Sequence, residues 1–425
     1  MRIINLAENT EGAAGCGFEH GLCFYIETEH HKLLMDTGQS DLFIKNAEKL
    51  GIDLTQVDTV VISHGHYDHG GGILHFVKIN PTAKIYIQAE AFGDYYSLNK
   101  QGEPRYIGLA KEIRDLPQVV IVDAIPLEEA EAGIDKPATS EAAEAPEEAK
   151  EAPTDAAEAP AEAIATAEER IVKFCEVEDS DTPADGAAAP RVFGEVEAEK
   201  EICRIDSELS LFTGIRNEYP VPSANQRLKM KTEEGLVQDD FKHEQCLVIS
   251  EGTKKVLLSG CAHHGILNIL DRYHELYGGQ PDVVISGFHM MKKSGYSDED
   301  ITMIIDTALE LRKMDTVFYT GHCTGVEPYN AMKKLMGDKL HYVHSGDEIR
   351  VRTTIDRIMW NVSEKAAKAS GASKGSERSG AEMTKEEALK IAKKKRREYM
   401  KWHKFFAWGT VVCFVLTMVT GYQRK

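Results

Sequence analysis

The stretch that decides the fold is Ile62-Ser63-His64-Gly65-His66-Tyr67-Asp68-His69-Gly70-Gly71-Gly72. It places three histidines and one aspartate within six positions, and neutral imidazole and carboxylate are ligands that zinc, manganese and iron accept. The residues before it, Val57 to Ile62, are rich in β-branched side chains and predict a short buried strand. The glycines after it allow the backbone to turn sharply. The sequence therefore predicts a strand that ends in a loop of metal ligands.

The spacing of these four residues predicts sites for two metal ions. In extended backbone, side chains two positions apart point the same way, so His64 and His66 can bind one ion together. Asp68 keeps that spacing, but His69 shares its direction only if the chain turns, and both then face a second ion. Two ions roughly 3.5–4 Å apart support hydrolysis at neutral pH. The alternative is a polar surface loop or a single structural zinc site, which four ligands so close together disfavour.

Further segments turn this pattern into a family resemblance. The His-x-His-x-Asp-His pattern of residues 64–69 resembles the metallo-β-lactamase superfamily. Further segments resemble one branch of it, typified by the archaeal dihydropterin aminobenzene ribofuranosyl phosphate synthases. These segments are Glu19-His20-Gly21-Leu22, Met35-Asp36-Thr37-Gly38, Ser259-Gly260-Cys261-Ala262-His263-His264-Gly265-Ile266, Gly287-Phe288-His289 and Thr320-Gly321-His322-Cys323-Thr324-Gly325. The resemblance covers about residues 1–125 and 202–352. It implies an α/β (α+β) fold, the αββα metallo-β-lactamase sandwich, with a dinuclear metal site at one edge of the sheets.

The resemblance also completes the ligand set, because it implies His263 and His322 as additional ligands. The implied ligands are His64, His66 and His263 for one ion, and Asp68, His69 and His322 for the other. The resemblance also implies that Cys261 stands where the family usually has a bridging aspartate, and Cys261 is either a soft thiolate ligand or a small buried residue beside the site. His264, adjacent to His263, is an alternative ligand.

Other residues receive roles around these ligands. Asp68 is expected to act as the catalytic base through the water between the ions, and His289 to contact the substrate or donate a proton, with a structural histidine as the alternative. The same alternatives, a substrate-contacting or proton-donating residue and a structural histidine, apply to His20. Asp36 is expected to orient a ligating histidine rather than to bind metal. Histidines without a supporting motif, such as His243, are treated as ordinary.

The net charge of −19 is concentrated in one segment, because residues 126–200 hold 22 Asp+Glu and 6 Lys+Arg and carry −16 of it. The rest of the chain is close to neutral and lacks a cationic track, so no nucleic-acid partner is expected. The eight cysteines show no spacing typical of a disulfide framework, and the N-terminus lacks the apolar run of a signal peptide. These features predict a reducing cytosolic setting and count against a secreted antibiotic-degrading enzyme.

Two parts of the chain are alike, residues 21–38 and 245–261. Each predicts a strand, a turn, a second strand and a polar loop, which is typical of a fold made of two related halves. Helical patterns follow at residues 41–50, 266–277 and 298–314. We expect the first half of the domain at residues 1–126 and the second half at residues 201–360.

The segment between the halves, residues 127–200, is an acidic Ala/Glu/Pro low-complexity insertion. It has little apolar surface to bury, so we interpret it as disordered or loosely helical. Residues 171–177 form a short apolar island inside it that can serve as a core strand. The whole tract is either a tolerated surface insertion or a partner-binding arm.

Beyond residue 360 the composition predicts three further segments: a flexible linker at 361–383, a basic juxtamembrane helix at 384–404 and a transmembrane helix at 405–422. The last run is uncharged, and its eighteen residues span about 27 Å as a helix, near the roughly 30 Å of a bilayer core. The sequence thus predicts a single-pass C-terminal membrane anchor, with a buried core helix as the alternative. The basic cluster at 393–397 predicts that the catalytic domain stays in the cytoplasm.

The leading functional hypothesis is a membrane-tethered, dinuclear metal-dependent hydrolase. It would use a metal-bound hydroxide on a small-molecule ester, lactone, amide or phosphoester, with two zinc ions, or manganese or iron, as cofactors. A second hypothesis, implied only by the resemblance, is a synthase-type condensation on a phosphorylated pterin-like substrate, for which Lys292 and Lys293 are candidate phosphate contacts. A third is a non-catalytic, metal-stabilised, membrane-tethered sensor or scaffold.

Overall fold

The computed structural model describes residues 1–12, 15–122 and 202–351, which form two large mixed sheets and one small sheet. The first sheet has the order β18 (Glu348–Arg350), β1 (Arg2–Ala7), β2 (Cys23–Glu27), β3 (Lys32–Met35), β4 (Thr59–Ile62), β5 (Lys84–Gln88) and β8 (Val119–Val122). The second has the order β17 (Leu340–Tyr342), β16 (Val317–Thr320), β15 (Val283–Ile285), β14 (Lys254–Leu258), β13 (Cys246–Glu251), β10 (Leu209–Phe212) and β9 (Ile202–Arg204). The predicted mixed α/β architecture is confirmed.

The two large sheets repeat one pattern of strand directions. In the first, β2 and β3 pair antiparallel, and β3, β4 and β5 then run parallel. In the second, β13 and β14 pair antiparallel, and β14, β15 and β16 run parallel. The similarity of residues 21–38 and 245–261 in the sequence therefore corresponds to equivalent strand pairs. Because carboxyl ends of neighbouring parallel strands meet at one sheet edge, both sheets gather their following loops there.

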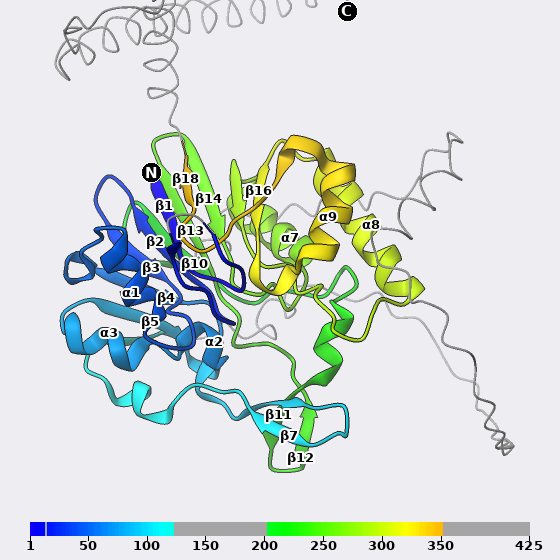
Figure 1. Cartoon of the computed structure of the whole chain (residues 1–425), viewed down its shortest axis with the longest axis horizontal. Helices are drawn as coiled ribbons and strands as arrows, with labels where there is room; N and C mark the ends of the chain where they lie inside the picture. Colours follow the sequence, from blue (N-terminus) through cyan, green and yellow to red (C-terminus); the bar gives the residue numbers. More distant parts are fainter. Residues whose placement is uncertain (13–14, 123–201, 352–425) are drawn as a thin grey trace, which may run out of the picture. The chain divides into compact units, whose positions relative to one another are not determined.

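The buried core lies in three layers, set by the alternation of side chains along the strands. Leu33 and Met35 of β3 face the second sheet, whereas Leu34 between them faces helices α1 (Leu42–Lys49) and α3 (Ile73–Ile79). On the far side, α7 (Ile266–Tyr277), α8 (Asp298–Lys313) and α9 (Val326–Met336) cover the second sheet. Figure 1 shows the two helical layers on opposite sides of the paired sheets. The predicted helices at 41–50, 266–277 and 298–314 agree with α1, α7 and α8.

The small sheet joins one hairpin from each half of the chain. Its order is β12 (Gly235–Gln238), β11 (Leu228–Thr232), β6 (Tyr95–Leu98) and β7 (Pro104–Tyr106), all antiparallel. It lies below the short helix α2 (Tyr67–Gly70) in the view of Figure 1. This sheet was not predicted.

A partly buried histidine also connects the halves. His31 lies in the turn between β2 and β3, with Nδ1 2.8 Å from an Asp58 carboxylate oxygen and Nε2 2.6 Å from Asp206, which precedes β10. Although burial opposes protonation, the hydrogen bond and charge of Asp58, together with Asp206, raise the pKa of His31. The bridge is therefore strongest when this ring is protonated.

The predicted membrane anchor requires correction. No helix within the described parts of the chain has both the length and the apolar composition needed to cross a bilayer. The longest, α8, has 16 residues and carries charges in its first and last turns, whereas a spanning helix needs about 20 mainly apolar residues. Residues 405–422, to which the transmembrane helix was assigned, lie outside the described residues, as do the insertion at 127–200, the linker and the basic helix. We therefore retract the transmembrane helix, the membrane partner and the membrane localisation derived from it.

Candidate metal centre

The histidines and acids predicted from the sequence gather at the carboxyl ends of the parallel strands. The motif residues follow β4, and α2 begins at Tyr67, which supplies the turn that His69 needs. Cys261 and His263 follow β14, and His322 follows β16. The side chains of all seven predicted ligands are buried or nearly so: His64, His66, Asp68, His69, Cys261, His263 and His322. The structure thus brings the two halves of the predicted set together.

Two asparagines fix the protonation of two of these rings. Asn225 donates through Nδ2 to the carbonyl of His263 at 2.6 Å and places Oδ1 3.0 Å from Nδ1 of the same residue. Asn9 holds His322 in the same way, with distances of 3.3 and 2.9 Å. Because an amide oxygen only accepts hydrogen bonds, each ring carries its proton on Nδ1 and leaves Nε2 with a free lone pair.

Asp36 sets two further rings in the same state. Its carboxylate lies 2.6 Å from Nδ1 of His69 and accepts hydrogen bonds from the amide and hydroxyl of Ser63 at 2.7 and 2.8 Å. The Ser63 oxygen lies 2.8 Å from Nδ1 of His64, so that ring donates to a hydroxyl that itself donates to Asp36. In His64 and His69 as well, Nδ1 is therefore engaged by an oxygen, and Nε2 is the nitrogen turned toward the other predicted ligands.

The free nitrogens suit a divalent cation. Nε2 atoms of His64 and His263 are buried and have no hydrogen-bond partner among the described residues. Nε2 of His66 is also buried without a hydrogen bond, but it faces the Asp239 carboxylate 3.8 Å away, so Nδ1 is the His66 nitrogen left for an ion. These three residues can place one ligand atom each within 4.8 Å of one another. Burial lowers the pKa of His64 and His263 well below the usual value, which keeps both rings neutral. Buried polar atoms without partners are costly, and a metal ion satisfies neutral imidazole nitrogens.

A second group lies beside the first. Nε2 of His69 is 3.2 Å from Nε2 of His322 and 3.1 Å from the Cys261 sulfur. Asp68 Oδ2 lies 3.5 Å from His322 Nε2 and 3.3 Å from Nε2 of His20, a half-exposed residue. Two nitrogens that both present lone pairs repel each other at this distance unless a proton or a cation lies between them.

The charges of this second group favour a cation. Burial lowers the pKa of His69, but the charges of Asp36 and Asp68 outweigh it and raise that pKa to about 9. Burial also opposes ionisation of Asp68, yet His69 and His322 hold the Asp68 pKa well below its usual range. Two carboxylates thus stabilise positive charge at the point where the two imidazoles meet.

The alternatives for the flanking residues differ in geometry. His264 points Nδ1 at Glu244, 2.7 Å away, which leaves His263 as the residue in the three-histidine group. Cys261 is buried and groups with His64 and His69, and burial raises the pKa of its thiol well above the usual value. The His289 ring lies beside the His263 ring, with centroids 4.3 Å apart and planes tilted by 57°, and its buried Nδ1 has no hydrogen-bond partner among the described residues.

Several residues of the centre carried no motif in the sequence. Asn9 and Asn225 were not singled out, and His243, treated as ordinary, is fully buried beside His64 and His66. Lys292, a candidate phosphate contact, instead pairs with both oxygens of Asp300 at 2.7 Å. The only available signal for His243 was its place two residues before the strand predicted from residue 245 onward, and four residues after an aspartate.

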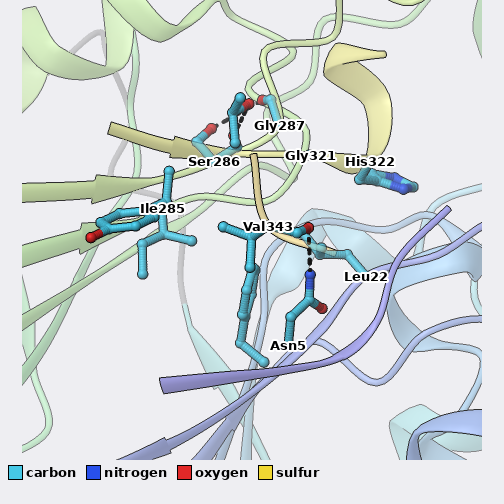
Figure 2. A pocket seen from close by; sticks show the side chains of 11 residues that line it. Asn5, Leu22, Ile285, Ser286, Gly287, Gly321, His322 and Val343 are labelled. Atoms are coloured by element: carbon cyan, nitrogen blue, oxygen red, sulfur yellow. Dashed lines mark hydrogen bonds between the residues drawn. The ribbon is translucent and has the colours of Figure 1, made fainter. Parts of the chain in front are cut away.

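A small cavity between β1, β2, β15 and β16 adjoins His322 (Figure 2). Its volume is about 10 Å³, which corresponds to about one water molecule. Asn5 lines the cavity and donates a hydrogen bond to the carbonyl of Val343 at 3.1 Å. The cavity is too small for a substrate and is part of the packing behind the centre.

Comparison with known proteins agrees with this geometry. Residues 16–140 match the sequence profile of the metallo-beta-lactamase superfamily. The uncharacterized protein MJ0448 of Methanocaldococcus jannaschii is 24% identical over 337 residues, which span 78% of this chain and 94% of that protein. The 7,8-dihydropterin-6-methyl-4-(beta-D-ribofuranosyl)-aminobenzene-5'-phosphate synthase of the same organism is 23% identical over 369 residues, which span 82% of this chain and 96% of the synthase.

A solved structure shares the fold. The crystal structure of Tm1679, described as a metal-dependent hydrolase of the beta-lactamase superfamily, aligns with a TM-score of 0.55 and 23% identity over 83% of this chain and all of that one. The family resemblance seen in residues 64–69 is confirmed by the match of residues 16–140 to the metallo-beta-lactamase superfamily, and the solved structure shares the fold.

Proposed function

We propose that this chain is a dinuclear metal-dependent hydrolase that acts on a small-molecule ester, lactone, amide or phosphoester. One observation carries the proposal: His64, His69, His263 and His322 each have Nδ1 against an oxygen atom, and each therefore turns Nε2 toward the same buried space. Four rings prepared in the same tautomer are expected of a metal centre, because a ligating histidine usually donates its other nitrogen to an oxygen.

The proposed ligands follow the two groups. His64, His66 and His263 would hold one ion, and Asp68, His69 and His322 the other, with Cys261 as an additional thiolate ligand. Zinc is the metal that best fits imidazole, carboxylate and thiolate together. Bound divalent ions in such a centre lower the pKa of water and polarise the oxygen of the bond to be cleaved.

Two residues of the chain would move protons. In hydrolysis, the bond between the acyl or phosphorus centre and the leaving atom breaks, and the oxygen of water takes its place. Asp68 stays ionised in this setting and would accept one water proton. His289, with its unpartnered Nδ1 beside His263, would supply a proton to the leaving oxygen or nitrogen.

The test is metal analysis of the purified full chain combined with hydrolysis of a substrate panel before and after chelation. We expect two ions per chain, activity lost on chelation and restored by zinc, and no activity in His66→Ala. His75→Ala is the matched control, because His75 is exposed on α3. Activity that persists after chelation or in His66→Ala would refute the mechanism, and a chain without bound metal would favour the non-catalytic scaffold.

A second candidate is a synthase-type condensation, favoured by the match to the archaeal synthase along 82% of this chain. The residue pair proposed for its phosphate gains no support, because Lys292 is occupied by Asp300. Incubation of the zinc-loaded chain with a phosphorylated pterin-like substrate and its condensation partner, followed by mass spectrometry, separates the two reactions. A product heavier than either substrate supports the synthase, and cleavage products support the hydrolase.

A further inference from the structure

One short segment surrounds the three-histidine group without belonging to the proposed ligand set. Residues 239–244 precede β13 and approach the group from the second half of the chain. The aromatic ring of Phe241 stacks flat on His263, with centroids 4.5 Å apart and planes at 3°. The Glu244 carboxylate accepts a hydrogen bond from the backbone amide of His263 at 2.7 Å. The segment therefore fixes His263 on two sides.

The same segment also reaches the first half of the metal motif. The backbone amide of Gly65, between His64 and His66, donates to Nδ1 of His243 at 3.0 Å. A backbone amide is always a donor, so Nδ1 of His243 is unprotonated and Nε2 of the neutral ring carries the proton. Nε2 then donates to Asp239 Oδ2, 3.2 Å away.

This tautomer decides what the neighbouring residues can do. His66, Asp239 and His243 lie close enough to form an ion site of their own. However, both nitrogens of His243 are engaged, one as acceptor from Gly65 and one as donor to Asp239, so the ring has no lone pair to offer. His243 is therefore a support for Asp239 and not a metal ligand.

Asp239 is held rigidly where it faces His66. Its side chain is fully buried, Oδ1 accepts the amide of Phe241 at 2.9 Å, and Oδ2 lies 3.8 Å from Nε2 of His66. His66 differs from the four rings described above, because the structure shows no hydrogen bond to its imidazole from the described residues. A carboxylate at this position favours the proton on Nε2 and leaves the lone pair on Nδ1.

We propose that Asp239, held in place by His243, is a positioning residue that sets the tautomer and orientation of His66 for the three-histidine ion. The proposal rests on the proposed metal centre, but not on the reaction that the centre performs. It predicts that loss of the carboxylate weakens one ion selectively and leaves the ion held by Asp68, His69 and His322 in place.

The experiment uses the full chain, stripped of metal and titrated with zinc against a chromophoric chelator. Asp239→Asn should weaken one of the two zinc ions by about 10- to 100-fold, the usual effect of losing such a partner. Asp240→Asn is the matched control, because it removes the same charge one residue further on, from an exposed side chain paired with Lys242. The control should bind both ions as the unaltered chain does.

The melting temperature of the stripped protein separates positioning from a general folding defect. We expect it to be similar in the two aspartate variants. Should Asp239→Asn unfold, His243→Gln and His243→Leu replace it, since only the glutamine amide can still donate to Asp239. His243→Gln should bind zinc with an affinity within a few-fold of that of the unaltered chain, whereas His243→Leu should lose this affinity for one ion.

Three results would overturn the inference. They are wild-type zinc affinity for both ions in Asp239→Asn, equal weakening of both ions, or equal losses in the two His243 variants. Failure of the unaltered chain to bind zinc would instead reject the proposed metal centre, and with it this inference. The two failures are thus distinguishable.

Discussion

Asp36→Asn provides a stringent test of the metal centre. Asp36 is fully buried with a φ of 62°, a backbone conformation that asparagine adopts more readily than most residues. The substitution therefore preserves shape and backbone while it replaces one carboxylate oxygen by an amide nitrogen. That carboxylate receives three hydrogens, from the Ser63 amide, the Ser63 hydroxyl and Nδ1 of His69.

An asparagine cannot satisfy all three donors. If the side-chain oxygen of the asparagine faces the Ser63 backbone amide, its NH₂ group faces the Ser63 hydroxyl and Nδ1 of His69, which are both donors. In the flipped orientation, the NH₂ group faces the Ser63 backbone amide, which is also a donor. His69 can escape only by moving its proton to Nε2, which removes the lone pair for a metal. A hydrogen bond to a charged group contributes about 1.5–3 kcal/mol. At about 1.4 kcal/mol per tenfold, the predicted loss of zinc affinity is about 10- to 150-fold.

Calorimetric titration of the stripped protein with zinc measures this loss directly. Asp41→Asn serves as the control, because Asp41 is an exposed acid near the same strand, paired with Lys45 at 2.8 Å. We expect the Asp36 variant to lose affinity for the ion held by His69, whereas the control keeps both ions. Unchanged affinity for both ions in Asp36→Asn would show that the carboxylate does not orient the ligands.

Three further predictions follow from other parts of the structure. His31 has a raised pKa, so its bridge adds stability that is complete below its unfolded pKa of about 6.5 and is lost as pH rises through the folded value. Between about pH 6 and about pH 9, the unaltered chain should therefore lose up to about 1 kcal/mol more free energy of urea unfolding than His31→Gln does, and equal changes in the two proteins would contradict the bridge. Gly260→Ala would drive a methyl group into the Ser63 side chain, so it should lower the unfolding free energy by about 1–3 kcal/mol and weaken zinc binding, and a variant as stable as the parent would contradict the packing. Cobalt-loaded protein should show sulfur-to-metal charge-transfer absorption that Cys261→Ser abolishes and Cys323→Ser retains; the reverse result would remove Cys261 from the ligand set.

Much of the fold could be predicted because its signals are local. The strand before His64 and the helices at 41–50, 266–277 and 298–314 follow from hydrophobic periodicity, which depends only on neighbouring residues. The equivalence of the two halves was visible because both repeat a strand, a turn and a strand. The small sheet was missed because β6 and β11 pair residues more than 120 positions apart in the chain, and periodicity does not reveal such partners.

In the candidate centre, too, the residues with local sequence signals could be predicted, and those that act from distant segments could not. The histidines stand in dense motifs, so their residue types alone point to metal. The residues that prepare them do not, because Asn9, Asn225 and Asp239 each act on a histidine from a separate segment of the chain. A single asparagine or aspartate in a loop has no spacing that distinguishes it from a solvated residue. Only the folded arrangement shows which oxygen meets which ring.

The backbone shows that this arrangement is imposed by the fold rather than by chance contacts. Within the described residues, five non-glycine residues have positive φ: Asp36, Phe241, Ala262, His289 and His322. Such conformations cost about 1–3 kcal/mol each and persist only where surrounding structure holds them. Four of the five lie within four residues after the ends of strands β3, β14, β15 and β16, and the fifth stacks on His263. Because the unfavourable conformations collect where the strands of both halves end around the same histidines, the packed sheets maintain the geometry that presents free imidazole nitrogens to a metal.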